Sequence, residues 1–331
     1  MKICIVKLSA MGDIIHAVVA LEFIKKHIPD SQIDWIVEGG FRGVLENNPH
    51  IDNILPVNLK SIKTKKSEFF TQYKLLKTYA KNDYDIVIDA QGLLKSAIVS
   101  RIIGAKKIAG FDKDSIRESI SALFYNSTVN IPYSANAIDR NMAVICQPLD
   151  IDYSKDEILN KKEFLYFPQK KDKRADSYIV LVVGASKENK VYPKEKFAQL
   201  LDKLKEKTIV VWGNDEEFTT ATFIANNSKY ATVAPKGNLD ALKAIIADSK
   251  MVIGGDTGPT HMGWGLNIPS ITIFGNTPEY RNTYITDINR VIKSDSKVNP
   301  LKLDYTDFSI REIEVDEIAN LYCDIMTNIK S

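Results

Sequence analysis

In the N-terminal half, the residues best suited to catalysis or ligand binding follow an apolar, β-branched run at the start of the chain. Residues 9–13 have the sequence SAMGD. Gly12 allows a tight turn or the close approach of a ligand, and Asp13 stands where a helix is expected to begin. Because Asp is a preferred helix cap, two interpretations are open: Asp13 caps the helix, or it is an active-site carboxylate.

A second polar segment, residues 89–96 with the sequence DAQGLLKS, also stands between an expected strand and an expected helix. Gln91 places a polar group at the sheet edge. Lys95 falls in the first helical turn, where the helix dipole disfavours a cation, which indicates either anion binding or an ion pair with Asp89. Upstream, a run of lysines is either a solvated surface or a basic loop that steers an anionic substrate: Lys60, Lys63, Lys65 and Lys66.

In the C-terminal half, residues 184–193 (GASKENKVYP) follow the first expected strand and end at a proline that favours a helix start. A hydroxyl at Ser186 and a lysine at Lys190, in a loop of small residues, are typical of a site that holds phosphate oxygens. The alternative is a loop of solvated lysines. The segment lacks the GxxxxGK[ST] pattern, so it is not a P-loop.

Residues 254–261 (GGDTGPTH) form the most specific pattern in the chain. Asp256 is expected to cap the helix that follows, and the glycines leave backbone amides unobstructed at its start, where anions bind. His261 lies on that helix and can reach the same space, although a lone histidine is more often structural. After another expected strand, Glu216 or Glu217 could accept hydrogen bonds from a ribose, but acids that open a helix are also ordinary.

Short β-branched runs alternate with longer amphipathic stretches, which predicts strand–helix–strand units, parallel sheets and an α/β fold. The alternation lapses over a polar stretch at 154–176 and then restarts, which predicts two tandem sheets with a connection between them. Ligands of such sheets bind beyond the carboxyl ends of the strands, where the segments above are placed. The expected strands are 3–7, 33–37, 53–57, 86–89, 178–183, 208–212, 251–254 and 268–274. The expected helices are 13–27, 67–80, 93–103, 193–205, 216–226 and 311–329.

Length and composition exclude several classes of protein. The 331 residues, of which 44% are hydrophobic, are enough for two packed domains. A formal charge of +2 excludes a nucleic-acid binder that works by bulk electrostatics. Three scattered cysteines exclude a disulfide framework or a CxxC metal site, and no metal is expected. No apolar run reaches about 18 residues and no cleavable leader is evident, so a cytoplasmic location without a membrane-spanning helix is expected.

Three segments, taken with their order and spacing, resemble the lipopolysaccharide heptosyltransferases of glycosyltransferase family 9: KLSAMGDIIH at 7–16, DAQGLLKS at 89–96 and DTGPTH at 256–261. The nearest likeness is to members that place the first heptose on the Kdo of the inner core. The resemblance implies a GT-B fold, with two Rossmann-like domains whose parallel sheets face a central cleft. It implies an acceptor-binding domain at 1–165, an ADP-heptose-binding domain at 166–310, and a helix at 311–331 that could pack back across the domains.

The resemblance further implies inverting transfer of heptose from ADP-heptose to Kdo-lipid A. No cofactor or metal would be required, and a monomer would make peripheral contact with the cytoplasmic face of the inner membrane. Asp13 matches the family's general base, and Lys190 matches a catalytic lysine near the donor phosphates. The expected donor-binding residues are Ser186, Lys190, Glu216, Glu217, Asp256, Thr257, Gly258, Pro259 and His261. The expected acceptor-binding residues are Ser9, Gly12, Lys60, Lys63, Gln91, Lys95 and Arg117.

Other functions stay open at this point. A related transferase could add a later heptose to heptose rather than to Kdo. From other classes, a sugar-nucleotide epimerase would consume the sugar nucleotide without an acceptor, and a non-catalytic binding protein would retain it unchanged. The chain has no GxGxxG after its first strand, no HExxH and no GxSxG, which disfavours dinucleotide oxidoreductases, zinc proteases and typical serine hydrolases.

Overall fold

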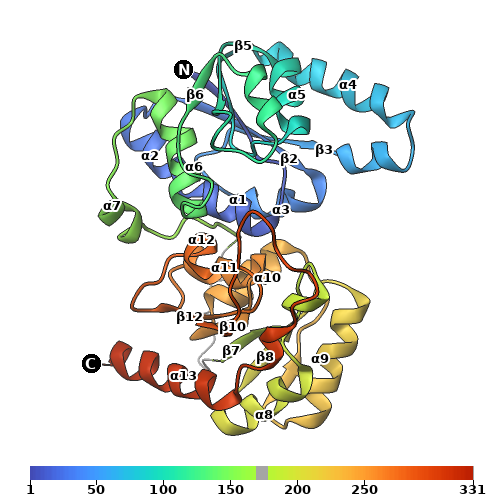
Figure 1. The fold of residues 1–331 in the computed structure, drawn as a ribbon, viewed down its shortest axis with the longest axis vertical. Coiled ribbons are helices and arrows are strands. Elements are labelled where there is room, and N and C mark those ends of the chain that lie inside the picture. The colour runs from blue at the N-terminus through green and yellow to red at the C-terminus, as the bar shows by residue number, and fades with distance from the viewer. Residues whose placement is uncertain (169–177, 331) are drawn as a thin grey trace. The chain divides into compact units, whose positions relative to one another are not determined.

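The computed structural model describes residues 1–168 and 178–330, the side chains of Lys63 and Lys330 excepted, and contains two compact units, Met1–Tyr166 and Phe167–Ser331. Each unit is a parallel sheet with helices packed against it (Figure 1). The strands form as expected from their apolar runs, because residues on both faces of the central strands are buried under helices. None of the described helices is long and apolar enough to span a bilayer.

The sheet of the N-terminal unit has the strand order β3-β2-β1-β4-β5-β6. Its strands are β1 (Lys2–Val6), β2 (Gln32–Glu38), β3 (Asn53–Val57), β4 (Tyr84–Asp89), β5 (Ala105–Phe111) and β6 (Ser127–Val129). Its helices are α1 (Met11–Val18), α2 (Ala20–His27), α3 (Arg42–Leu45), α4 (Glu68–Tyr79), α5 (Leu94–Ile103), α6 (Ala137–Cys146) and α7 (Lys155–Leu159). This is the Rossmann order, in which the direction of winding reverses between β1 and β4.

The sheet of the C-terminal unit repeats this topology with the order β12-β11-β10-β7-β8-β9. Its strands are β7 (Ile179–Val182), β8 (Thr208–Val211), β9 (Ala231–Val233), β10 (Met251–Gly255), β11 (Ser270–Phe274) and β12 (Asn289–Lys293). Its helices are α8 (Lys194–Leu204), α9 (Asp215–Asn227), α10 (Leu239–Ala247), α11 (Gly258–Gly265), α12 (Glu279–Asn282) and α13 (Val315–Lys330). Here the winding reverses between β7 and β10.

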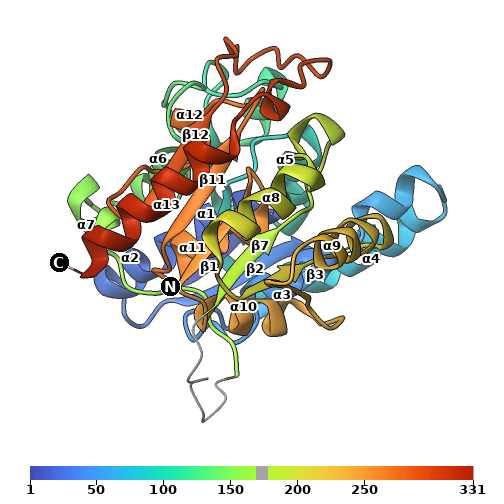
Figure 2. The same cartoon turned by 90° about the horizontal axis from the view of Figure 1, so that it is seen from below.

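The C-terminal helix belongs to the second unit. It begins at Val315 rather than at 311, after a short 3-10 turn at Ser309–Arg311. Ile318 and Ile325 of α13 are fully buried in the core of this unit, and Figure 2 shows the helix alongside α8 and β11. The packing that the structure shows for α13 is therefore against the sheet of its own unit.

Three other expectations need correction. The single helix expected at 13–27 is divided into α1 and α2 at Val19. Part of the polar stretch at 154–176 is ordered in the N-terminal unit, because Ser154 and Glu157 cap helix α7 reciprocally; residues 169–176 of that stretch lie outside the described residues. The strand series does not close at Phe274, since β12 adds a further strand beside β11.

Candidate active site

Each sheet has one point at which its winding reverses, and the predicted polar segments lie at these two points. In the N-terminal unit, residues 9–13 and 89–96 follow the neighbouring strands β1 and β4. In the C-terminal unit, residues 184–193 and 254–261 follow or end the neighbouring strands β7 and β10. Loops diverge at such a point and leave room for a ligand, so each unit has a candidate ligand site of its own.

Gln91 ties together the two loops of the N-terminal site. Its side-chain oxygen accepts hydrogen bonds from the backbone N–H groups of Leu8 at 3.1 Å and Ser9 at 3.0 Å. Buried Lys7 adds a second link by donating to the backbone oxygen of Ala90 at 2.8 Å. The side-chain oxygen of Gln91 is thus already hydrogen-bonded to the backbone. Its direct role is to hold the half-buried Ser9 in place.

Asp13 is the third residue of α1 and its side chain is exposed. The N-cap position belongs to Ala10, and Asp13 supports it by accepting the Ala10 N–H at 3.1 Å on Oδ2. Gly12 is helical, so the tight turn expected there does not form. One backbone hydrogen bond fixes the Asp13 carboxylate at the helix N-terminus while leaving it accessible, which is compatible with both structural and catalytic roles.

The ion pair suggested between Lys95 and Asp89 does not form. Asp89 is fully buried and accepts instead from the backbone N–H groups of Gln91 and Gly92 and from the hydroxyl of Tyr125 at 2.8 Å. Burial raises the pKa of Asp89, against the effect of these donors. Asp89 therefore shapes the loop, whereas Lys95 is exposed and its charge acts on Glu38 of β2.

Of the remaining acceptor-side cations predicted from the sequence, Lys60 and Arg117 are exposed on the surface of the same unit. Lys60 lies on the 3-10 helix η2 (Leu59–Lys63), with its Nζ 5.2 Å from the centre of the Phe41 ring; Lys63 is on the same helix, but its side chain is outside the described residues. Arg117 is exposed, and the next residue, Glu118, accepts the backbone N–H of Leu94 at the start of α5. Arg117 is thereby held close to the loop after β4.

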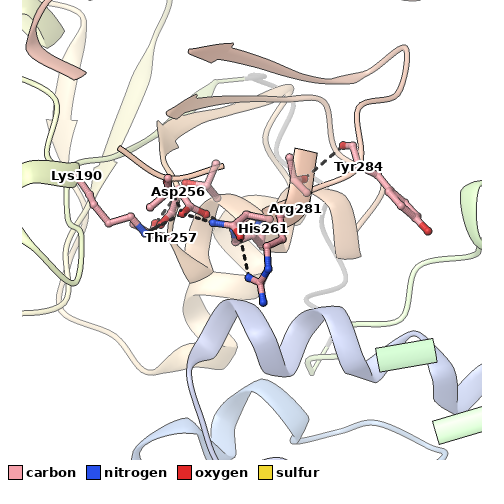
Figure 3. A network of polar contacts seen from close by, with 10 residues as sticks. Lys190, Asp256, Thr257, His261, Arg281 and Tyr284 are labelled. Carbon is pink, nitrogen blue, oxygen red and sulfur yellow. Dashed lines mark hydrogen bonds and ion pairs between the residues drawn. The ribbon is translucent and has the colours of Figure 1, made fainter. Parts of the chain in front are cut away.

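In the C-terminal unit, Asp256 is the centre of a compact polar network (Figure 3). Its carboxylate accepts from Lys190 Nζ at 2.7 Å, His261 Nε2 at 3.0 Å, Thr277 Oγ1 at 3.0 Å and Asn282 Nδ2 at 2.9 Å. The first donor comes from the loop after β7, the second from α11, and the last two from the segment after β11. Three separate parts of the unit thus converge on one buried carboxylate.

The charge of Asp256 is stabilised by this network. Burial alone would raise the pKa of Asp256, but the Lys190 ammonium and the His261 ring hold it well below its usual range. The carboxylate is therefore ionised and already saturated with donors. This corrects the expectation that Asp256 caps the following helix: the cap position of α11 is Thr257. Asp256 instead orients Lys190 and His261.

The first turn of α11 provides anion-binding backbone groups. The helix begins at Gly258, Pro259 occupies its second position, and the half-buried hydroxyl of Thr257 lies 3.4 Å from that of Thr260. Pro259 has no N–H and cannot donate. The amides of Gly258 and Thr260 can donate to a ligand, because no carbonyl four residues earlier within the helix accepts from them. An anion at this end is also favoured by the helix dipole.

The loop that carries Lys190 is anchored by an aromatic side chain. Tyr192 is 2% exposed, donates from its hydroxyl to the backbone oxygen of Ile313 at 2.9 Å, and packs edge-on against Phe197. Lys190 is 17% exposed, so its ammonium is partly desolvated next to Asp256. Ser186, in contrast, is exposed at the outer part of the same loop.

The structure distinguishes between the two candidate ribose-binding carboxylates, Glu216 and Glu217. Glu217 accepts from the backbone N–H of Gly213 at 2.7 Å and from Asn214 Nδ2 at 2.9 Å. A Cβ at Gly184 would lie only 2.2 Å from the Glu217 carboxyl group, so Glu217 lies directly against the loop that follows β7. Glu216 is exposed on α9. Of the two, Glu217 is the one that lies at the carboxyl ends of β7 and β8.

Sequence reasoning missed Thr277 and Asn282, which complete the Asp256 network, and Arg281, which lies beside it in Figure 3. The available signal was their position: they follow β11, the strand next to β10, and so come from the same sheet edge. Among the described residues, no three His, Cys, Asp or Glu side chains are grouped so that they could hold a metal ion.

Comparisons with known proteins agree with this architecture. The model of glycosyltransferase family 9 (heptosyltransferase) matches residues 72–305. Lipopolysaccharide heptosyltransferase 1 of Campylobacter coli is 40% identical, over 97% of this chain and 98% of that one; its counterpart in Escherichia coli strain K12 is 30% identical, over 84% and 88%. The solved E. coli heptosyltransferase WaaC with ADP superposes with a TM-score of 0.82 at 24% identity, covering 98% of this chain and all of that one.

The chain therefore belongs to glycosyltransferase family 9, the heptosyltransferases. Within that family it is a lipopolysaccharide heptosyltransferase, as its relatives over nearly the whole chain are. The fold predicted from the sequence, an α/β GT-B fold of two Rossmann-like units, is confirmed by both sheets and by the match to WaaC.

Proposed function

We propose that this enzyme transfers heptose from ADP-heptose to the Kdo of Kdo-lipid A by an inverting, metal-independent mechanism. The observation that carries the proposal is the Lys190–Asp256–His261 network at the N-terminus of α11, which is built to hold a negatively charged leaving group. Relatives support the identities of the substrates: one solved structure is WaaC with ADP-2-deoxy-2-fluoro heptose, and the similar sequences are named heptosyltransferase 1.

On the donor side, Lys190 and the first-turn amides of α11 face the charge that develops on the leaving ADP. Asp256 fixes the ammonium of Lys190 in place through a 2.7 Å ion pair. Donors that are oriented before the reaction stabilise charge in the transition state without reorganisation, a role that a metal ion plays in other transferases. Ser186 and Thr257 add hydroxyl groups at the same edge of the sheet.

On the acceptor side, Asp13 accepts the proton of the acceptor hydroxyl as this oxygen attacks the anomeric carbon of the heptose. Attack from the face opposite the leaving ADP inverts the anomeric centre. Ser9 and Gly12 hold the acceptor near this carboxylate, and Lys60, Lys63, Lys95 and Arg117 supply positive charge for its acidic groups. The Gln91 contacts to Leu8 and Ser9 keep the loop in this arrangement.

Glu217 binds the ribose of ADP-heptose in this proposal, and Glu216 does not. Glu217→Ala is expected to weaken ADP binding about 10–100-fold, because a carboxylate that accepts hydrogen bonds from ribose hydroxyls is lost. Glu216→Ala is the matched control, since it removes the same group from the exposed neighbour. Calorimetric titration with ADP checks both variants. Equal affinities of the Glu217 variant and the unchanged protein would refute the assignment.

We also propose peripheral contact of the N-terminal unit with the cytoplasmic face of the inner membrane. Residues 60–81 contain seven lysines and one acidic residue, whereas the whole chain carries only +2. On α4, Phe69, Phe70 and Tyr73 are 49%, 68% and 40% exposed. Exposed aromatic side chains among lysines are typical of a surface that binds anionic lipid headgroups and inserts into the interface.

Reversing charge at Lys65 and Lys66 tests the membrane contact. The double variant Lys65→Glu/Lys66→Glu is expected to reduce co-sedimentation with anionic vesicles at least ~10-fold, because each basic residue near such a surface contributes about 1 kcal/mol. Lys229→Glu/Lys236→Glu, which changes two exposed lysines of the other unit, is the control. Equal loss of vesicle binding in both variants would show that the protein binds vesicles only by non-specific charge attraction. No loss in either variant would exclude residues 60–81 as the membrane-binding surface.

The activity itself is tested with purified Kdo-lipid A and ADP-heptose, by following ADP release with and without a chelator. Transfer to Kdo-lipid A that persists in the chelator supports the proposal. Transfer only to an acceptor that already carries heptose would assign a later step of the core. Consumption of ADP-heptose without an acceptor, or none at all, would favour an epimerase or a binding protein. Loss of activity in the chelator would disprove metal independence.

A further inference from the structure

Two buried asparagines stand directly before two of the residues that bind Asp256. Asn189 precedes Lys190 in the loop after β7, and Asn276 precedes Thr277 in the segment after β11. Lys190 Nζ and Thr277 Oγ1 both donate to the same oxygen of Asp256, Oδ2, at 2.7 and 3.0 Å. Each asparagine is only 3% exposed, so its amide must find a partner within the protein.

The two asparagine side chains converge on one backbone carbonyl. Nδ2 of Asn276 donates to the backbone oxygen of Asp304 at 2.6 Å, and Nδ2 of Asn189 donates to the same oxygen at a longer distance, 3.4 Å. A pair of two-residue bridges therefore joins the Asp304 carbonyl to Oδ2 of Asp256. In each bridge the asparagine is fixed at one end, and the residue that follows it is fixed at the other.

The amide of Asn276 keeps its orientation although one of its atoms is left without a partner. Its Oδ1 is buried and accepts no hydrogen bond from any residue that the structure describes. Turning the amide over would place this oxygen against the carbonyl of Asp304, and two acceptors would then be in contact. A buried acceptor without a donor destabilises a fold. Such conflicts are typical of functional sites, which favours a role of Asn276 in the site.

The turn that presents the Asp304 carbonyl is itself held in place. The Asp304 side chain accepts the backbone N–H of Thr306 at 2.8 Å and the hydroxyl of the same residue at 2.7 Å. A Cβ at Gly275 would lie 2.7 Å from Cβ of Ile310, so the segment after the turn packs closely against the residue before Asn276. The carbonyl is therefore a defined anchor for both amides.

The same segment is also joined to the loop that carries Lys190 by contacts at the surface. Arg311 pairs with Glu188 at 3.1 Å, and Lys187 Nζ lies 5.7 Å from the centre of the Tyr305 ring. Exposed ion pairs contribute little, because water competes for both partners. Hydrogen bonds between buried groups are stronger, so the two asparagine amides are the contacts best placed to fix this loop.

We propose that Asn189 and Asn276 are positioning residues for the departure of the leaving group. By holding both bridges on one carbonyl, they keep the Lys190 ammonium in place before the donor binds. The inference rests on the proposed function, in which Lys190 stabilises the leaving ADP, and extends it to the residues that fix this lysine. Precise placement matters because an error of about 1 Å can lower the rate about 100-fold.

The test is a double-mutant cycle in kcat, measured with the full chain, ADP-heptose and Kdo-lipid A. Asn276→Ala is expected to lower kcat about 10–100-fold, and Asn189→Ala, which removes the longer contact, is expected to lower it less. The KM for Kdo-lipid A should not change, because both residues lie in the donor-binding unit. In the Lys190→Ala background, Asn276→Ala should change kcat less than about 2-fold, because no ammonium is left to position.

Asn289→Ala is the matched control for a structural effect. Asn289 is also buried in this unit, and its Nδ2 donates to the backbone oxygen of Ile268 and to Ser270 Oγ, both at 3.0 Å. It stands at the start of β12, whereas the site lies at the carboxyl ends of the strands. This variant should melt at a lower temperature with unchanged kcat. An unchanged kcat for Asn276→Ala, or equal losses with and without Lys190, would overturn the proposal.

Asp304→Ala tests the same anchor through an exposed side chain, in case the Asn276 variant does not fold. Its removal leaves the core intact but releases the turn at Thr306. The expected loss of kcat is about 2–10-fold, the usual effect of one hydrogen bond, and it should vanish in the Lys190→Ala background. Asp295→Ala, which removes another exposed aspartate of the same segment, is the control. A loss that persists without Lys190, or no loss at all, would overturn the proposal.

Binding of ADP keeps this inference distinct from the proposed function. If the unchanged protein transfers heptose but the effects of Asn276→Ala and Lys190→Ala on kcat are additive, the asparagines are structural and the proposed function stands. If the unchanged protein transfers no heptose, the proposed function fails, and the same cycle is measured calorimetrically in the dissociation constant for ADP. Coupled losses of ADP affinity would still support the positioning role, and additive losses would refute it.

Discussion

Asp13→Asn is expected to lower turnover at least ~100-fold while leaving the affinity for ADP-heptose nearly unchanged, because general-base assistance contributes about 10²–10⁴-fold. Asparagine keeps an oxygen that can accept the Ala10 N–H, so the start of α1 should stay intact. The substitution therefore removes basicity with little change in structure. The measurement is kcat with Kdo-lipid A, together with calorimetric titration of the donor.

Asp30→Asn provides the control for this experiment. Asp30 is an exposed aspartate of the same unit, away from the strand ends that carry the site, and its substitution should leave turnover unchanged. Full activity of Asp13→Asn would remove Asp13 as the base. A parallel loss of donor binding and melting temperature would instead show that Asp13 acts mainly as a structural group at the helix start.

Lys190→Ala is expected to reduce turnover about 100–1,000-fold, the usual cost of removing one pre-oriented donor that stabilises developing negative charge. The KM for ADP-heptose should also rise, because in the proposed function the ammonium contacts the donor phosphates in the ground state. The variant should be less stable by about 3 kcal/mol, the lower end of the usual cost of breaking a buried ion pair, since the carboxylate loses its cation but keeps three hydrogen-bond donors.

The interpretation of Lys190→Ala depends on separating chemistry from stability. Lys187→Ala removes an exposed lysine of the same loop, whose Nζ lies 5.7 Å from the centre of the Tyr305 ring, and should change neither parameter strongly. Assays are run well below the melting temperature of each variant. Unchanged kcat and KM for Lys190→Ala would mean that this lysine only balances the charge of Asp256.

The sequence predicted the strands next to the site to within about two residues at either end. It did so because continuous apolar runs such as 86–88 and 251–253 can be satisfied only by burial on both faces of a sheet. It missed β5, in which Lys106 and Lys107 interrupt the apolar pattern, and the three-residue strands β6 and β9. The strands β6 and β9 lie at sheet edges and depend on pairing with a neighbour already in place, which local patterns do not reveal.

The candidate site was predicted as a set of loops, but not as a set of contacts. Spacing placed Lys190 and Asp256 after two strands of the second half, yet it did not indicate that they form an ion pair or that Thr277 and Asn282 complete it. It offered two roles for Lys95, anion binding or an ion pair with Asp89, and the ion pair is wrong because Asp89 accepts from the hydroxyl of Tyr125 instead. Such partners lie 20 or more residues apart, so only the folded sheet shows which side chains meet.

The hydrogen-bond donors that surround the Asp256 carboxylate have a consequence for stability and activity at low pH. A carboxylate whose pKa is held well below the ordinary range contributes its full stabilisation above that range, and this stabilisation declines progressively as the pH falls from the ordinary value to the depressed one. In the folded protein, the Asp256 carboxylate should remain ionised throughout the mildly acidic conditions in which most carboxylates take up protons. An acid limb in the pH–rate profile must accordingly report the protonation of some other group.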